Sequence, residues 1–150
     1  MRTQSQSRAR YGLGIWSFVS VVFGLIFFLR GGAATFSDDS IRMGSAAFIL
    51  GAGFIGQVSM IYLTREKSNT SPLVRDERDL EIARQANEGA LVGVLVFVYV
   101  VCIALFLGYE KTGSLPVGWT WFLAYITGCF GLIAQAIATL VLHNKMSGNE

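Results

Sequence analysis

Side chains that could carry out chemistry are few in this chain and lie far apart. His143, the only histidine, is 14 residues from Cys129. That separation is roughly 21 Å along a helix, which is too far for both to bind one metal ion. Cys102 and Cys129 are the only cysteines, and both lie inside apolar segments, so we expect small hydrophobic residues rather than a redox pair. With no Gly-rich phosphate loop and no G-x-S-x-G motif, the sequence predicts no enzyme, no cofactor and no metal site.

Uncharged polar side chains inside the apolar segments form the first candidate site. Ser17, Gln57 and Gln135 each lie about six or seven residues from the end of a segment, so we expect them at one depth, ~10 Å below the cytoplasmic surface. Such an intramembrane polar layer favours either hydrogen bonds between helices or a path for a permeating substrate. No Asp, Glu, Lys, Arg or His lies in the interior of these segments, which argues against a proton-coupled transporter.

The second candidate site is a charged stretch in the middle of the chain that has the pattern of a helix. Asp76 is a candidate N-cap, and the carboxylates at and just after it suit the positive end of a helix dipole. Oppositely charged side chains then recur at i,i+3 and i,i+4 spacing, in the pairs Arg75/Asp79, Arg78/Glu81, Glu81/Arg84 and Arg84/Glu88. The stretch is therefore either a solvated linker helix or a docking surface.

As a docking surface, this helix would present one narrow stripe of apolar or small side chains among its charges. The stripe consists of Leu80, Ala83, Ala86 or Asn87, and Ala90. A continuous helix from Asp76 to Leu107 would be about 48 Å long, beyond the ~30 Å hydrocarbon core, so it must project into the cytoplasm or bend at Gly89. The residues that we expect to contact a partner are Asp76, Glu77, Arg78, Leu80, Glu81, Ala83 and Arg84.

The elements that must position these residues are four apolar segments, each close to the ~20 residues that cross a bilayer. They are residues 11–29, 43–63, 89–107 and 119–142. With 53% hydrophobic and 15% charged residues, the chain is too apolar for an ordinary soluble domain. We predict an all-α membrane fold in which residues 1–150 form a single domain of two helical hairpins, joined by a cytoplasmic loop and helix at 64–88. His143 lies at the end of the last segment, where we expect it to contact lipid headgroups or helix carbonyls.

The distribution of Lys and Arg predicts the orientation. The N-terminal tail has three, residues 64–88 have five and the C-terminal tail has one, whereas the two short loops have Arg30, Arg42 and Lys111. Both termini should therefore be cytoplasmic in a multi-pass protein of the inner membrane. The basic residues form no patch, so we expect no nucleic-acid partner.

The two halves of the chain show a faint likeness at an offset of 78 residues. Gln57 matches Gln135 and Gly53 matches Gly131, among others. Apolar segments also match by chance. A duplicated hairpin would relate the halves by an axis along the membrane normal.

The triplet Asp76-Glu77-Arg78, with Ile82 and Ala86 at four-residue steps and an apolar segment directly behind, resembles a family of small bacterial membrane proteins of unknown function. These proteins have an Asp-Glu-Arg signature before the third transmembrane helix, and residues 116–125 are similar to their pattern as well. The resemblance covers about half of the chain, residues 75–142. It implies no catalytic residues. Some related small membrane proteins act beside DNA-binding regulators, so the resemblance also implies a signalling role.

The sequence thus predicts a non-enzymatic integral membrane protein that docks a cytoplasmic partner, a regulator or another copy of itself, through residues 76–88. The alternative is a small oligomeric channel or transporter whose path passes Ser17, Gln57 and Gln135. In both hypotheses the lipid bilayer surrounds the helices.

Overall fold

The apolar segments fold as long helices in a computed structural model that describes residues 4–29, 31–63 and 77–147. Within these ranges the long helices are α1 (Gln4–Phe28), α3 (Ser40–Leu63), α4 (Glu77–Tyr109) and α5 (Gly118–Ser147), and a short helix, α2 (Ala33–Phe36), follows α1. Each long helix is long and apolar enough to cross a membrane. The predicted all-α fold with four candidate spans is confirmed.

The helices extend beyond the apolar segments that predicted them. α1 begins at Gln4, well before residue 11, and α5 continues to Ser147. Because the polar residues at these ends include no Pro, a helix formed in the apolar segment continues through them. α4 runs without interruption through Gly89. Asp76, the predicted N-cap of this helix, lies outside the described residues.

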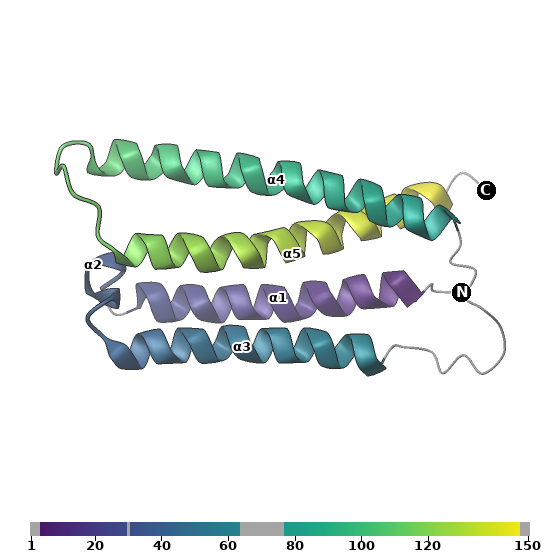
Figure 1. The fold of residues 1–150 in the computed structure, drawn as a ribbon, viewed down its shortest axis with the longest axis horizontal. Coiled ribbons are helices and arrows are strands. Elements are labelled where there is room, and N and C mark those ends of the chain that lie inside the picture. Colours follow the sequence, from purple (N-terminus) through teal and green to yellow (C-terminus); the bar gives the residue numbers. More distant parts are fainter. Residues whose placement is uncertain (1–3, 30, 64–76, 148–150) are drawn as a thin grey trace.

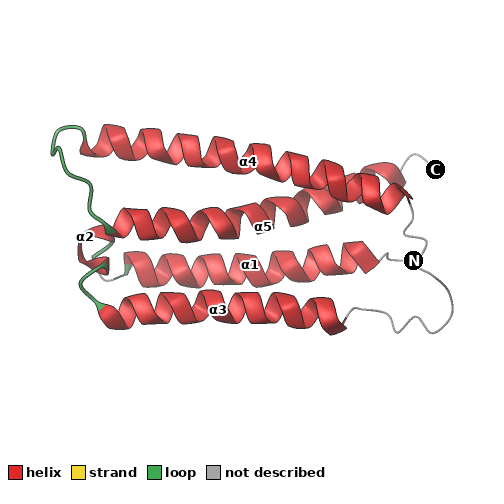
Figure 2. Cartoon of the chain, in the orientation of Figure 1, coloured by secondary structure: helices red, strands yellow, loops and turns green. Residues whose placement is uncertain are grey.

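The long helices lie side by side in the order α3, α1, α5, α4 (Figure 1). Each runs antiparallel to its neighbours, so α1 begins and α5 ends at the same end of the molecule, which we call the N/C end. The opposite end, which holds α2 and the connection between α4 and α5, we call the loop end. Figure 2 shows helices joined by loops throughout the described residues.

This order does not fit the duplicated hairpin that the internal likeness suggested. A two-fold axis would carry α1 onto α4 and α3 onto α5, and would therefore carry the contact between α1 and α5 onto a contact between α4 and α3. Instead α3 and α4 lie at opposite edges of the array (Figure 1). The two hairpins pack through non-equivalent helices.

Aromatic side chains hold α1, α2 and α5 together at the loop end. Phe27 of α1 lies 5.1 Å from Phe36 of α2 and 4.6 Å from Phe122 of α5, measured between ring centroids. Phe27 and Phe36 are fully buried. Gly118 allows the close approach of α2 and α5, since a Cβ added there would lie 2.2 Å from the carbonyl oxygen of Ala33. This cluster fixes α5 against α1 through large apolar contact areas.

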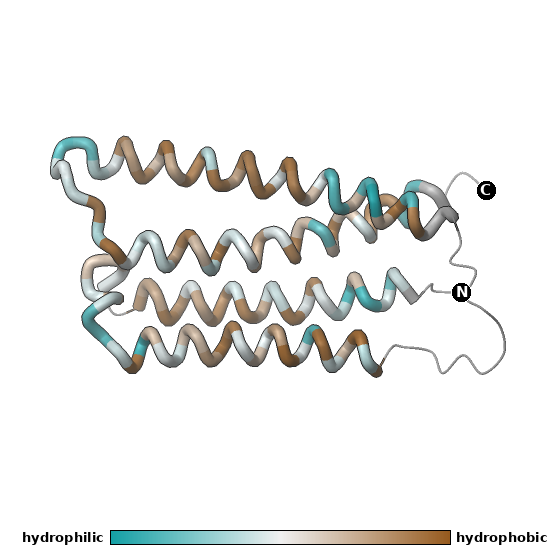
Figure 3. Tube along the Cα trace, viewed as in Figure 1, coloured by the Kyte–Doolittle hydropathy of each residue, from teal (hydrophilic) through white to brown (hydrophobic). Residues whose placement is uncertain are grey.

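Along the helices, most residues in the middle are hydrophobic, and hydrophilic residues lie mainly toward the two ends (Figure 3). The most apolar window of α4 is only 6% buried, and large side chains such as Leu91, Leu95 and Phe106 are more than half exposed. An apolar surface of this size is stable in contact with lipid and not with water. The fold therefore supports contact with a lipid bilayer.

Arg42, which the sequence analysis counted as a base of a short loop, belongs to a helix. It lies in the first turn of α3 and is only 4% exposed. Its guanidinium donates to the carbonyl oxygens of Phe27 at 2.8 Å and Ile26 at 3.3 Å, and to Thr35 Oγ1 at 3.0 Å. These carbonyls belong to the last turn of α1, where carbonyl oxygens have no N–H partner within the helix. The negative end of the helix dipole also lies there. Arg42 therefore caps α1 from the neighbouring helix.

We expect Arg42→Ala to lower the free energy of unfolding by about 2–3 kcal/mol, because hydrogen bonds from a charged donor are lost at a buried helix end. The measurement is reversible unfolding in mixed micelles, followed by circular dichroism. Lys111→Ala is the matched control, because it removes an exposed base at the same end and should change stability by less than about 0.5 kcal/mol. Equal effects of the two substitutions would contradict the capping role.

Candidate functional site

A cavity of about 200 Å³ lies in the half of the array nearer the N/C end, and every long helix contributes to its wall. α1 contributes the most, with Ser5, Arg8, Ala9, Gly12 and Trp16. These residues recur at three- and four-residue steps and so share one face of the helix. From Ser5 to Trp16 the cavity follows α1 for roughly 16 Å, which takes it to about the middle of that helix.

Two of the three residues of the predicted polar layer line this cavity. Gln57 comes from α3 and Gln135 from α5. Ser17 is not part of the wall, because it follows Trp16 directly and points about 100° away from it around the helix. The predicted common depth therefore brings together Gln57 and Gln135, while Trp16 takes the place expected for Ser17.

Gln135 makes the kind of bond between helices that the sequence predicted. Its Nε2 donates to Oδ1 of Asn87 on α4 at 2.7 Å. The bond links α5 to α4 close to the cavity. Ala86 and Ala90, which flank Asn87 along α4, are buried. The bond holds the two helices in register at the N/C end.

Two polar atoms of the residues in the cavity wall are not satisfied. Trp16 Nε1 and Gln57 Oε1 are both buried, and neither has a hydrogen-bond partner among the described residues. Trp16 is 1% exposed, and its six-membered ring packs against Gly53 of α3. Gln57 Oε1 lies beside Gly12, where an added Cβ would be 3.4 Å away. An unsatisfied buried donor or acceptor costs about 1–3 kcal/mol, so two in one cavity wall require an explanation.

The start of α4, residues 77–88, forms another part of the site. Here Ile82 is 1% exposed, Ala86 0% and Ala90 8%, so the buried stripe follows four-residue steps. Of the predicted stripe, Ala86 and Ala90 are buried against the other helices, whereas Leu80 is 45% exposed and Ala83 is exposed too. Near the N/C end α4 crosses α5 (Figure 1). Helices that cross at an angle commonly pack through rows of residues at four-residue steps, and Ile82, Ala86 and Ala90 form such a row.

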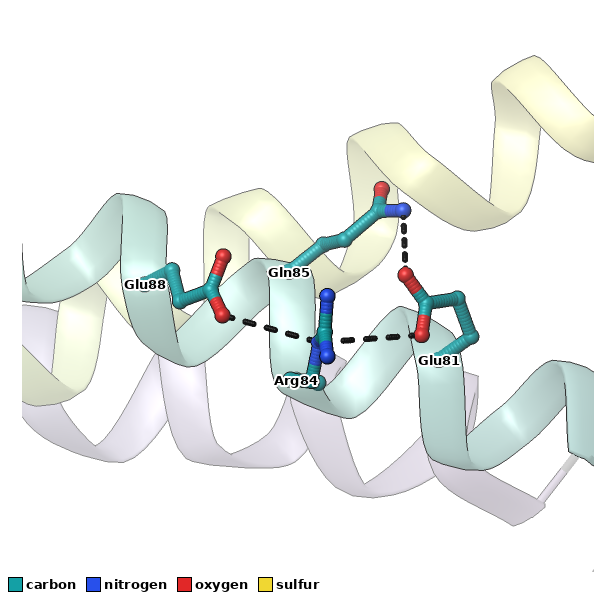
Figure 4. A network of polar contacts seen from close by, with 4 residues as sticks. All are labelled: Glu81, Arg84, Gln85 and Glu88. Carbon is teal, nitrogen blue, oxygen red and sulfur yellow. Dashed lines mark hydrogen bonds and ion pairs between the residues drawn. The ribbon is translucent and has the colours of Figure 1, made fainter.

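The exposed side of the α4 start carries a chain of charges (Figure 4). Arg84 Nε lies 3.7 Å from Glu81 Oε2 and 3.5 Å from Glu88 Oε1, and Gln85 Nε2 donates to Glu81 Oε1 at 2.8 Å. The predicted pairs Glu81/Arg84 and Arg84/Glu88 are confirmed. The predicted pairs Arg75/Asp79 and Arg78/Glu81 involve side chains outside the described part of the chain. Each exposed pair stabilises the helix by roughly 0.2–0.5 kcal/mol.

The residues predicted to contact a partner are only partly described. Leu80, Glu81, Ala83 and Arg84 are exposed on α4, and Ala83 also lines the cavity. Glu77 and Arg78 belong to α4, but their side chains lie outside the described part, as does the whole of Asp76. The described part of this surface is thus helical, exposed and charged.

His143, which we expected to contact lipid headgroups or helix carbonyls, is buried and so does not face headgroups. It is 4% exposed, and its Nε2 shares a hydrogen bond of 2.5 Å with Oγ of Ser5. Sequence reasoning missed the contact because the two residues are 138 positions apart. It joins the end of α5 to the start of α1, beside the cavity. Among the described residues no group of three or more His, Cys, Asp or Glu side chains could hold a metal ion.

These features define a candidate multi-pass membrane protein with a partly polar cavity at its N/C end. Comparison of the chain with protein-family models, curated proteins and solved structures finds no match. The resemblance to small bacterial proteins with an Asp-Glu-Arg signature therefore stays a prediction, and a functional assignment rests on geometry and chemistry.

The bond between Gln135 and Asn87 can be measured with a double-mutant cycle. We expect Gln135→Leu and Asn87→Leu to show a coupling free energy of about 0.6 kcal/mol, the average for such bonds in membranes. The measurement compares unfolding of both single variants, the double variant and the wild type in mixed micelles. Additive effects of the two substitutions would show that the bond contributes nothing to the packing of α4 on α5.

Proposed function

We propose that this protein is a non-enzymatic docking protein of the inner membrane, which binds a soluble cytoplasmic protein through the exposed side of the α4 start. The carrying observation is that α4, with 33 residues, is about 50 Å long while the hydrocarbon core is ~30 Å thick. About a dozen residues are left over, and the charged end of the helix is the part that lies outside the membrane.

Burial of Ile82 and Ala86 supports a docking role over that of a loose linker. Both are at most 1% exposed, so this segment of α4 is packed against the rest of the array while its opposite side is free. A partner therefore meets a helix that is already ordered, which reduces the entropy lost on binding. A solvated linker helix needs no such packing.

The partner proposed here has basic groups opposite Glu81 and Glu88 and an acidic group opposite Arg84. Exposed ion pairs within one helix contribute little, between about 0 and 1 kcal/mol, so these side chains can exchange their internal partners for external ones. Leu80, which is 45% exposed beside these charges, adds a small apolar contact. The partner surface is thus complementary in charge along two turns of helix.

The alternative function is a small oligomeric channel or transporter. Its specific support is that Gln57 and Gln135 line one cavity. Against it, no described residue of α1 beyond Trp16 lines that cavity, so a continuous path needs residues from further copies of the chain. For this function Gln57→Leu with Gln135→Leu should abolish flux, whereas a docking protein should keep its partner.

Orientation is the first prediction to test. The N/C end, where the charges of the α4 start lie, is cytoplasmic under the positive-inside rule, and the burial of Arg42 leaves the loop end still poorer in free positive charge. In a background with Cys102→Ala and Cys129→Ala, we expect a membrane-impermeant maleimide to label Leu115→Cys and not Leu80→Cys in intact spheroplasts. Both positions are exposed. Inverted vesicles should give the opposite result, and labelling of residue 80 from outside would reject the docking function.

The docking surface itself is tested by charge reversal. Glu81→Lys, Arg84→Glu and Glu88→Lys together keep both internal ion pairs with their signs exchanged, so the helix should remain formed. We expect a stoichiometric soluble partner that co-purifies with the wild type in mild detergent to bind at least about tenfold more weakly, since like charges then face each other. Gln57→Leu is the control and should retain the partner. Retention by the reversed variant contradicts the proposal.

A further inference from the structure

We propose that a different cavity, at the loop end, binds a cationic amphiphile from the bilayer, which means an apolar chain that ends in an amine or quaternary ammonium group. This inference goes beyond docking at the α4 start and does not depend on it. The cavity lies between the last turns of α4, the connection that follows them and the first turns of α5. Its volume is about 450 Å³, within the range of about 300–1,000 Å³ that is typical of small-molecule sites.

One side of α4 forms the long wall of this loop-end cavity. The wall residues of this helix follow the i, i+3, i+4, i+7 spacing of a single helix face and are Cys102, Leu105, Phe106 and Tyr109. The wall therefore extends for roughly 11 Å from the end of α4 into its apolar part. Phe106 is 65% exposed, so in a membrane this wall is open to lipid. An apolar chain can thus enter sideways from the bilayer and lie along α4.

The charge of the wall selects a cation. Among the residues that line the cavity, Glu110 is the only Asp, Glu, Lys, Arg or His, and it directly follows the last residue of α4. Neither Glu110 nor its neighbour Lys111 takes part in an ion pair within the described part of the chain. The exposed carboxylate of Glu110 can therefore pair with a cationic group, whereas an anionic group beside it would be repelled.

Hydrogen bonds fix the end of the cavity where Glu110 lies. Tyr109 Oη accepts from Trp119 Nε1 at 2.7 Å, and the carbonyl oxygen of Tyr109 accepts from the backbone N–H groups of Thr112 and Gly113 at 3.1 Å. Gly113 has a φ of 64°, which a glycine after the end of a helix adopts without strain. Because this part of the wall is ordered before a ligand arrives, less entropy is lost on binding. The aromatic ring of Tyr109 also suits a quaternary ammonium group.

The experiment uses the full chain in phosphatidylcholine nanodiscs with ¹⁵N-labelled tryptophan. The three tryptophans give three indole N–H resonances, and Trp119→Phe identifies that of Trp119. This N–H reports on the cavity, because it is bonded to the wall residue Tyr109, whereas Trp16 and Trp121 do not line the cavity. The probe is octyltrimethylammonium. 1-Octanol has the same chain without the charge, octyl sulfate has the opposite charge, and tetramethylammonium has the charge without the chain.

We expect octyltrimethylammonium to shift the Trp119 resonance saturably while the resonances of Trp16 and Trp121 stay in place. At equal concentration in the bilayer, 1-octanol and octyl sulfate should bind at least about fivefold more weakly, the upper end of what an exposed ion pair contributes. Tetramethylammonium should give no saturable shift, because it cannot occupy the apolar wall along α4.

Variants then test the two parts of the wall separately. Glu110→Gln should weaken binding of octyltrimethylammonium roughly fivefold, for the same reason. Asp38→Asn is its matched control, because it removes an exposed carboxylate at the same end of the molecule but outside this cavity. Ser114→Phe places a bulky ring in the wall and should block binding, whereas Val117→Phe, at a position that is 64% exposed and outside the wall, should not.

Three outcomes would overturn the proposal. In the first, octyltrimethylammonium causes no saturable shift of the Trp119 resonance, so the cavity is not a site for it. In the second, 1-octanol or tetramethylammonium binds as well as octyltrimethylammonium, so the site does not require both a chain and a charge. In the third, Glu110→Gln and Asp38→Asn weaken binding equally, so the carboxylate acts only through the charge of the surface. If Ser114→Phe does not fold, the comparison of Glu110→Gln with Asp38→Asn decides alone.

Discussion

Lipid offers no hydrogen bonds, so polar groups inside a membrane protein have to find partners within the chain. At the loop end Arg42 reaches from α3 to the last carbonyls of α1, and Trp119 Nε1 of α5 donates to Tyr109 Oη of α4 at 2.7 Å. At the N/C end Gln135 bonds to Asn87, and His143 bonds to Ser5. Each of these contacts joins two helices. Apolar helix surfaces alone could slide along each other with little change in energy. The polar contacts fix the position of each helix along its neighbour.

The two ends of the array are packed differently. At the loop end α2 and its Phe36 fill the space beside α1, and aromatic rings close the contact with α5. The described part of the N/C end has no comparable short helix. There α4 crosses α5, and Ile82 lines the cavity. The same crossing buries one side of the α4 start and leaves the charged side exposed. The cavity and the proposed docking surface are therefore two sides of one helical segment.

The existence and approximate position of the spans were predictable, because hydropathy and length are properties of the sequence alone. The same holds for the ion pairs of Arg84, which depend only on spacing within one helix. The order of the helices was not predictable, since lipid-facing and protein-facing residues are equally apolar. For that reason the sequence did not show that Ile82 is buried against the other helices, and Arg42 was counted as a loop charge. The contact of His143 with Ser5 needed the fold as well, because nothing in the sequence relates its two ends.

The polar layer shows most clearly where sequence reasoning ends. Equal depth was a sound criterion for Gln57 and Gln135, yet depth does not say which side of a helix a residue occupies, so Ser17 was included and Trp16 was not. Trp16 lies in the apolar segment 11–29 and was not singled out there, although its indole N–H requires a partner as an amide does. Gln135 is bonded to Asn87. Among the described residues of the cavity wall, the buried polar atoms without a hydrogen-bond partner are therefore Trp16 Nε1 and Gln57 Oε1. Two unpaired atoms of opposite polarity in one wall cost more than a packed apolar pair would. Hydrogen bonding in this wall depends on which atoms the neighbouring helices bring close, and the sequence alone does not specify that.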